Sequence, residues 1–145
     1  MARKIGLFWL VLAGATLSSP ALAEIGRVKS SVGQVQIQRG NTQLPVRPGL
    51  QLEQGDYITT GKNGRLGIAF VDDTRFAVGP NAKIRLSKFG YDKTRQTGEF
   101  VTEVDRGSLG VVSGKIAKTK QDAMKMRTPT AMLGVRGTKF ILDIR

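Results

Sequence analysis

The sequence predicts an all-β fold, a sandwich or barrel built from many short antiparallel strands. Three observations predict this class. Apolar and polar residues alternate with a period of two along much of the chain, as they do in strands with one buried face. Turn-forming residues recur at spacings of roughly ten residues. The 145-residue chain also contains 18 glycines, which suits a fold with many tight corners.

Six segments carry the alternation, and we expect their apolar residues to face the core. The first is Gln34–Gln38, in which Val35 and Ile37 alternate with glutamines. The inward residues of the others are Leu66, Ile68 and Phe70, then Phe76 and Val78, then Ile84 and Leu86, then Phe100, Thr102 and Val104, and finally Phe140, Leu142 and Ile144. Turn signals separate them at 39–41, 48–49, 61–64, 72–74 and 79–81.

Residues 113–126 depart from this pattern, because their apolar spacing fits neither a strand nor a helix well. We expect a short exposed helix or an irregular excursion there. Five bases lie in or next to the segment: Lys115, Lys118, Lys120, Lys125 and Arg127. They form the candidate binding patch for an anionic partner, and the alternative is a charged face that is merely solvated.

The first 23 residues resemble a secretory signal peptide. Arg3 and Lys4 precede an apolar run, and Ala21-Leu22-Ala23 supplies the small residues of a cleavage site. The run is shorter than the about 20 residues that span a bilayer, although a retained N-terminal anchor is the alternative. We therefore predict cleavage after Ala23 and a single mature domain of residues 24–145, in the periplasm or secreted, with no transmembrane segment.

The chain is strongly basic. Its net charge of +12 falls to +10 when the two bases of the predicted signal peptide are removed (12 − 2), and its pI is about 10.6. Such a charge usually indicates nucleic acid as a partner, but predicted export argues against it. We expect instead an unknown protein or an anionic envelope component. The alternative is a basic domain with no charged partner.

The composition excludes several common chemistries. The chain has neither Cys nor His, so disulfides, Cys/His metal sites and nucleophile–histidine arrangements are ruled out. Asp72 and Asp73 are the best carboxylate pair, but neighbours on a turn point apart and Asp favours turns, so we expect a structural role. The phenylalanines occupy inward positions, which weakens the case for glycan binding. We predict no enzymatic activity, no metal and no cofactor.

Two stretches, taken together, resemble the signatures of the FecR domain family. The residues that match the first signature are Gly55-Asp56, Ile58-Thr59-Thr60-Gly61, Asp72-Asp73 and Gly79-Pro80-Asn81. Those that match the second, within TPTAMLGVRGTKF (128–140), are Thr128-Pro129, Ala131, Gly134, Arg136-Gly137-Thr138 and Phe140. The likeness covers roughly residues 33–142.

The resemblance implies a periplasmic all-β sandwich of jelly-roll type. In the iron-siderophore regulators of that family, the domain follows a cytoplasmic sigma-factor-binding segment and a membrane helix, whereas this chain has a predicted signal peptide there. Our leading hypothesis is a stand-alone, exported, non-catalytic binding or interaction module of the cell envelope. The alternatives are a sensor component of a cell-surface signalling system of the iron-uptake type and an envelope glycan-binding domain or enzyme.

Arg136 raises a separate question, because it lies between Gly134 and Gly137 in an otherwise apolar run. We expect it to be structural. The glycines indicate backbone torsions or close approaches that a side chain would prevent. A guanidinium suits unpaired carbonyl oxygens or one carboxylate, and Asp56 is the candidate carboxylate. If that pair is buried, Arg136→Ala costs about 3–5 kcal/mol of stability.

Overall fold

The computed structural model describes residues 6, 14–17, 22–137 and 139–145. Most of the predicted signal peptide and the signature residue Thr138 therefore lie outside the described residues. The first strand begins at Glu24. In the part of the chain that is described, no helix has the length and apolarity needed to cross a membrane.

The described residues form strands almost throughout, with one short helix, so the all-β prediction is confirmed. The strands are β1 (Glu24–Val32), β2 (Val35–Arg39), β3 (Thr42–Leu44), β4 (Gln51–Glu53), β5 (Tyr57–Thr60), β6 (Arg65–Phe70), β7 (Arg75–Val78), β8 (Lys83–Asp92), β9 (Thr97–Val112), β10 (Met124–Arg127), β11 (Met132–Val135) and β12 (Lys139–Ile144). The helix α1 spans Lys115–Thr119.

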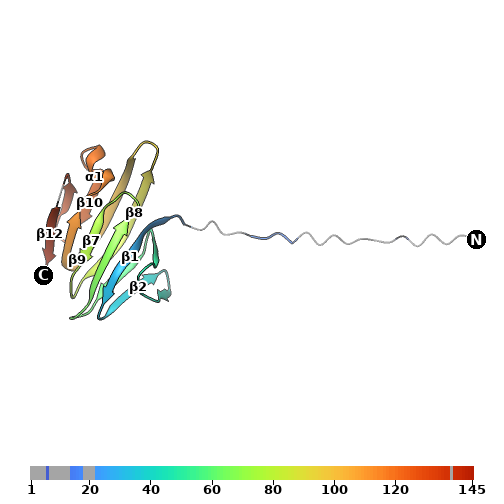
Figure 1. Ribbon diagram of the computed structural model, residues 1–145, viewed down its shortest axis with the longest axis horizontal. Helices are drawn as coiled ribbons and strands as arrows, with labels where there is room; N and C mark the ends of the chain where they lie inside the picture. The colour runs from blue at the N-terminus through green and yellow to red at the C-terminus, as the bar shows by residue number, and fades with distance from the viewer. Residues whose placement is uncertain (1–5, 7–13, 18–21, 138) are drawn as a thin grey trace, which may run out of the picture.

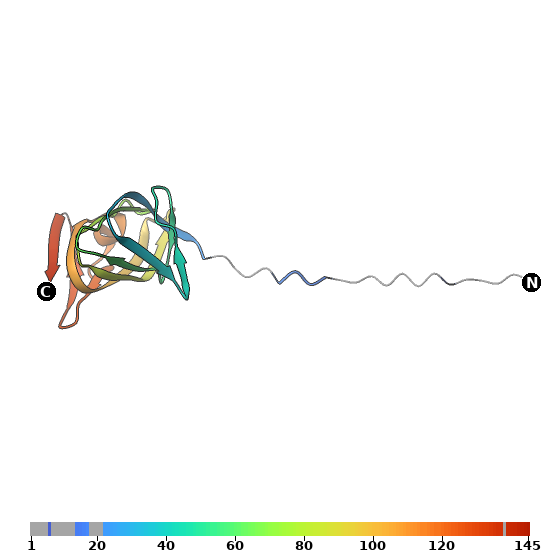
Figure 2. The same cartoon turned by 90° about the horizontal axis from the view of Figure 1, so that it is seen from below.

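The strands make one curled sheet whose two halves close around the core (Figures 1 and 2). We call the halves sheet A, with strand order β4-β1-β6-β7-β9-β12, and sheet B, with order β3-β2-β5-β8-β9-β10-β11. The long strand β9 belongs to both. Its first part pairs with β8 and β10, and its last part pairs with β7 and β12.

Gly107 lies where β9 passes from sheet B to sheet A. Its φ is +93°, a conformation that side chains strongly disfavour. A Cβ atom at this position would also lie 2.4 Å from the Cα atom of Ala82. The corner of the sandwich therefore depends on the absence of a side chain here.

One ladder departs from the predicted antiparallel arrangement, because β10 runs parallel to β9. The excursion predicted over 113–126 explains this difference. It contains α1 and a turn, and together they carry the chain back to the start of β9. The helix is not an exposed one as predicted, because Ile116 and Ala117 are buried, and β10 begins at Met124, inside the predicted range. Parallel strands need such a crossover, whereas antiparallel strands can be joined by a tight turn.

The core lies between the two sheets, and phenylalanines from both meet in it. The ring of Phe70 in β6 lies 4.7 Å from that of Phe76 and 4.8 Å from that of Phe100, both edge to face. Phe89 of β8 packs against Phe100 at 4.8 Å. The inward residues predicted from the alternation are buried, except Val35 of β2 and the three inward residues of β12, which are only half-buried.

Asp72 anchors the helix to the turn between β6 and β7. Its side chain is buried and accepts hydrogen bonds from the backbone N and the hydroxyl of Thr74, at 3.1 and 2.8 Å. It also accepts one from the backbone N of Ile116 in the first turn of α1, at 3.2 Å. Asp73 is exposed and forms an ion pair with Lys115 at 3.2 Å. The two carboxylates thus point apart, in agreement with a structural role.

Candidate functional site

The outer face of sheet A has a floor of small residues. The strand register places Gly67 of β6 opposite Ala77 of β7, and Ala77 opposite Gly110 of β9. We call these three residues the small-residue floor. The next position in the same row, on β12, is Ile141. Nothing larger than a methyl group projects from the floor. The Ser30 hydroxyl of β1 lies over Gly67, 2.6 Å from where a Cβ atom would be, so the backbone open to contact is that of β7 and β9.

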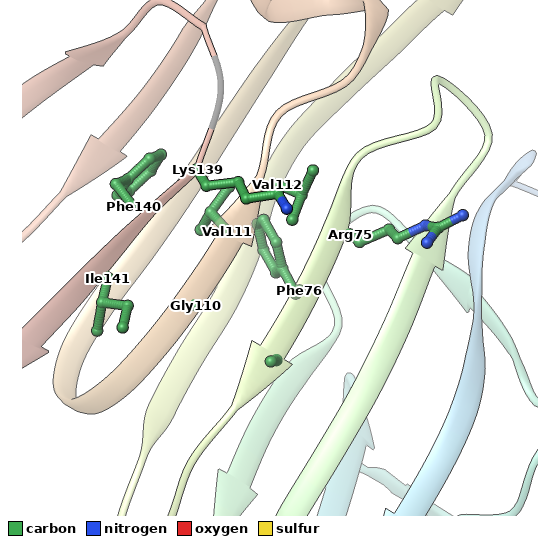
Figure 3. A pocket seen from close by; sticks show the side chains of 9 residues that line it. Arg75, Phe76, Gly110, Val111, Val112, Lys139, Phe140 and Ile141 are labelled. Carbon is green, nitrogen blue, oxygen red and sulfur yellow. The ribbon is translucent and has the colours of Figure 1, made fainter.

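Two hollows adjoin at Ala77 on this face. The larger has a volume of about 600 Å³ and lies between β7, β9 and β12 (Figure 3). The smaller, of about 200 Å³, lies between β1, β6 and β7. The side chains bordering them are Arg75, Val112, Lys139 and Ile141 around the larger, and Val32 and Arg65 around the smaller.

The apolar side chains at the rim are unusually open to solvent. Val32 is 62% exposed, Val112 38% and Ile141 80%. Single exposed apolar residues are common on protein surfaces. Three around one floor of small residues instead form an apolar surface of the kind that marks interaction sites.

The bases at the same rim are unneutralised. Within the described residues, Arg65, Arg75 and Lys139 form no ion pair. In Figure 3 the side chain of Lys139 runs beside Val112, while that of Arg75 points away from it. We call the floor and this rim together the sheet A face. It combines apolar surface with unpaired positive charge.

The outer face of sheet B differs, because its charged groups contact one another. The register aligns Tyr57, Arg85, Glu103 and Arg127 in one row across four strands. The guanidinium of Arg85 lies 5.7 Å from the centre of the Tyr57 ring, and that of Arg127 lies 3.0 Å from the carboxylate of Glu103. A charged partner would have to displace these contacts.

The five bases of the sequence-predicted patch are not gathered into one unpaired cluster. Lys115 and Arg127 form the ion pairs with Asp73 and Glu103 described above. Lys118 and Lys120 are exposed on or after α1, and Lys125 lies half-buried on β10. The patch is therefore spread over the end of the sandwich and the outer face of sheet B.

Glu99 interacts with two bases of this patch, Lys120 and Lys125, and with Lys88 of β8. Its carboxylate lies 2.9 Å from the Nζ atom of Lys88. This hydrogen bond is the main cause that lowers the pKa of Glu99, and Lys125 and Lys120 lower it further by their charge. Lys88, Lys120 and Lys125 thus share one acid. Among the described residues, the bases of the sheet A rim have no acidic partner.

The predicted pair of Arg136 with Asp56 is wrong, because Asp56 is bound by Arg39. The Asp56 side chain is 0% exposed, and its two oxygens accept hydrogen bonds from Nε and Nη2 of Arg39, each at 2.9 Å. A third hydrogen bond comes from the backbone N of Glu53 at 2.9 Å. The hydrogen bonding to Asp56 raises the pKa of Arg39.

The register explains why Arg39 takes this place. Gln38 of β2 is opposite Tyr57 of β5, so the next residue of β2 lies beside Asp56. Arg136 follows β11, at the other edge of sheet B, and it is exposed with no ion pair to any described residue. In the sequence, Arg39 stands out only as the first residue of the turn signal at 39–41, and nothing there indicates its pairing with Asp56.

The glycines beside Arg136 agree with their predicted roles. Gly137 has a φ of +90°, and its carbonyl oxygen accepts a hydrogen bond from Ser113 Oγ at 2.7 Å. A Cβ atom on Gly134 would lie 2.3 Å from Oδ1 of Asp122. Together they carry the chain from the edge of sheet B to the edge of sheet A.

The remaining signature residues form corners. Gly55 has a φ of +92° and Asn81 one of +54°. A Cβ atom on Gly61 would lie 2.5 Å from the Gln34 side chain, and Gly79 packs against Ser108. Pro80 and Pro129 occupy a turn and a bend between strands. None of these residues borders the larger hollow.

No group of acidic side chains in the described ranges could hold a metal ion. The arrangement of the sheet A face suits binding, since it presents apolar surface, open backbone and positive charge without an acid–base pair beside the hollows.

Comparison with known proteins identifies the family. The family model described as "FecR protein" matches residues 56–145, from the buried Asp56 to the end of β12 and beyond. No curated protein and no solved structure matches the chain. The matched stretch is more than half of the sequence and contains both signatures except Gly55, so this chain belongs to the FecR protein family.

Proposed function

We propose that this chain is an exported, non-catalytic binding module of the cell envelope, and that its sheet A face binds an acidic segment of another envelope protein. FecR proteins are regulators of cell-surface signalling, so the chain is a domain related to such regulators. The observation that carries the proposal is the apolar, positively charged face above the small-residue floor.

The chemistry of the face favours an acidic partner with apolar side chains. Three unpaired bases attract negative charge, while Val32, Val112 and Ile141 remain exposed and favour apolar contacts. The floor allows an extended backbone to approach closely at Gly110 and Ala77, because Gly110 has no side chain and Ala77 only a methyl group. An extended acidic segment matches all three properties.

Export and the absence of catalysis rest on other observations. The predicted signal peptide ends at Ala23, directly before β1. The chain lacks Cys and His, and its buried carboxylates, Asp56 and Asp72, are hydrogen-bonded within the fold. These features support a periplasmic location and a role in binding.

Fluorescence anisotropy with short labelled peptides tests the binding face. We expect a peptide of alternating Glu and Val to bind at low salt and a peptide of alternating Lys and Val not to bind. Binding should weaken strongly above about 0.1 M salt, where the Debye length falls below about 10 Å. Replacing Arg65, Arg75 and Lys139 together by Ser should weaken it at least tenfold.

A matched variant separates the face from net charge alone. Lys93, Arg95 and Arg106 are exposed bases that line neither hollow, and replacing them by Ser removes the same charge. This variant should bind almost normally. Equal loss in both variants would show general attraction and contradict the assignment of the face. Binding to anionic lipid vesicles without binding to the acidic peptide would contradict a protein partner.

A further inference from the structure

We propose that the chain forms a two-fold symmetric dimer through β12, whose free edge pairs antiparallel with the same edge of a second copy. The two copies of sheet A would then form one continuous sheet across the dimer. This inference rests on the edge of β12, which contributes Lys139 and Ile141 to the sheet A face as well.

The edge of β12 differs from those of β3, β4 and β11, the other strands at the ends of the two sheets. Strands β3 and β4 have three residues each and β11 has four, so they offer little backbone to a neighbour. Short edge strands are a common way to prevent edge-to-edge pairing. Strand β12 has six residues, contains no proline and pairs with β9 without a register shift. Among the described strands it pairs with β9 alone.

The side chains of β12 also lack full cover. Ile141 points outward and is 80% exposed. Phe140, Leu142 and Ile144 face the core but are only half-buried. A strand added at this edge would cover apolar surface on both sides of the sheet, which favours association. An unpaired edge with apolar side chains on both faces can act as a template for another strand where the charges that it carries find opposite charges across the pair.

The sequence of β12 is complementary to itself about Ile141. In an antiparallel pair related by a two-fold axis perpendicular to the sheet, residues opposite each other must face the same side. When the pairing is centred on Ile141, Lys139 of each copy lies opposite Asp143 of the other copy, which gives two such pairs. It places Ile141 opposite Ile141 on the outer side, and Phe140 opposite Leu142 on the inner side.

The neighbouring register is unfavourable. Centred on Leu142, the pairing would place Ile141 opposite Asp143 and Lys139 opposite Arg145, which brings like charges together. Opposite charges directly across a strand pair stabilise it by about 0.2–1 kcal/mol each, and like charges destabilise it. Charge and apolar matching therefore both select the register centred on Ile141. That register also keeps the two sheet A faces on the same side of the dimer.

Sedimentation velocity of the full chain at increasing concentration tests the dimer. Physiological salt is used because it largely screens the repulsion between the two basic copies beyond about 8 Å. We expect reversible dimerisation in the micromolar range. Lys139→Asp and Asp143→Lys should each abolish it, because each places like charges opposite one another. The double variant carrying both changes should restore it.

A cross-linking experiment fixes the register. Because the chain has no cysteine, Ile141→Cys introduces a single thiol on the proposed axis. Directly opposite Cβ atoms lie about 4.5–5.5 Å apart, close to the distance that a disulfide joins, so oxidation should yield a covalent dimer. Val32→Cys, an exposed position on β1 outside the free edge, should cross-link far less. A monomer at all concentrations, or a double variant that stays monomeric while folded, would overturn the proposal.

Discussion

Replacing Arg39 tests which arginine holds the buried acid of the FecR signature. Asp56 is 0% exposed and receives three hydrogen bonds, two of them from Arg39. Arg39→Ala removes both and leaves a buried carboxylate without its counterion. Breaking a buried pair in this way costs about 3–5 kcal/mol. The Arg39 side chain is 32% exposed, so water can enter the space left behind, and we expect a loss of about 3 kcal/mol, near the lower limit.

Urea denaturation measures this loss directly. For a slope of roughly 2 kcal/mol/M, the midpoint should fall by about 1.5 M while the slope stays unchanged. Arg39→Lys should recover only part of it, because one ammonium cannot bridge both carboxylate oxygens as the planar guanidinium does. The matched control is Arg136→Ala, which removes an exposed arginine and should change stability by less than about 0.5 kcal/mol. A wild-type midpoint for Arg39→Ala together with a strong loss for Arg136→Ala would refute the assignment.

Three further predictions follow from the same structure. Gly107→Ala and Gly137→Ala both place a side chain at positive φ, at a cost of about 1–2 kcal/mol, but only Gly107 lacks space for the Cβ atom. Thermal unfolding should therefore show a loss for Gly107→Ala that is larger by about 1–3 kcal/mol, and equal losses would contradict the close approach to Ala82. Intact mass of the protein recovered from the periplasm should correspond to a chain beginning at Glu24, and a mass that includes the first 23 residues would contradict export with cleavage. Replacing Lys118 and Lys120 by Ser should weaken binding of the acidic peptide less than replacing Arg75 and Lys139 by Ser. The reverse order would indicate that the peptide binds the patch predicted from the sequence and not the sheet A face.

The strands that the sequence predicted are those with an uninterrupted period-two pattern. Strand β6, with Leu66, Ile68 and Phe70 buried, is one example. Strand β1 was missed because its register shifts between Val28 and Ser30, so the alternation is broken where the strand bends. Strand β10 does alternate, with Met124 and Met126 buried, but it is short and follows a lysine-rich excursion. Local patterns predict strands well only where the sheet is regular.

The sheet A face could not be predicted from the sequence, because its parts meet only through long-range pairing. Gly67, Ala77, Gly110 and Ile141 come from four strands, and each is unremarkable in its own segment. The pairing of Arg39 with Asp56 was missed for the same reason, since it depends on the register of β2 and β5. A run of lysines, by contrast, is visible in the sequence even where the fold distributes it over two surfaces.

Most residues that match the family signatures lie at corners of the fold, whereas the exposed side chains at the rim of the larger hollow are not among the matching residues. The signature corners bind one another: Thr60 Oγ1 donates a hydrogen bond to the carbonyl of Gly79 at 2.6 Å, and the backbone N of Asn81 donates one to the carbonyl of Gly61 at 3.1 Å. These contacts fix the two turns that set the positions of β5, β6, β7 and β8. Of the residues that line the larger hollow, Phe140 matches the second signature, whereas the exposed rim residues Arg75, Val112, Lys139 and Ile141 are not among the matching residues. Because these four side chains are exposed, they can change without loss of the corner contacts. We therefore expect family membership to determine the scaffold and, under the proposed function, the residues exposed on sheet A to determine the partner.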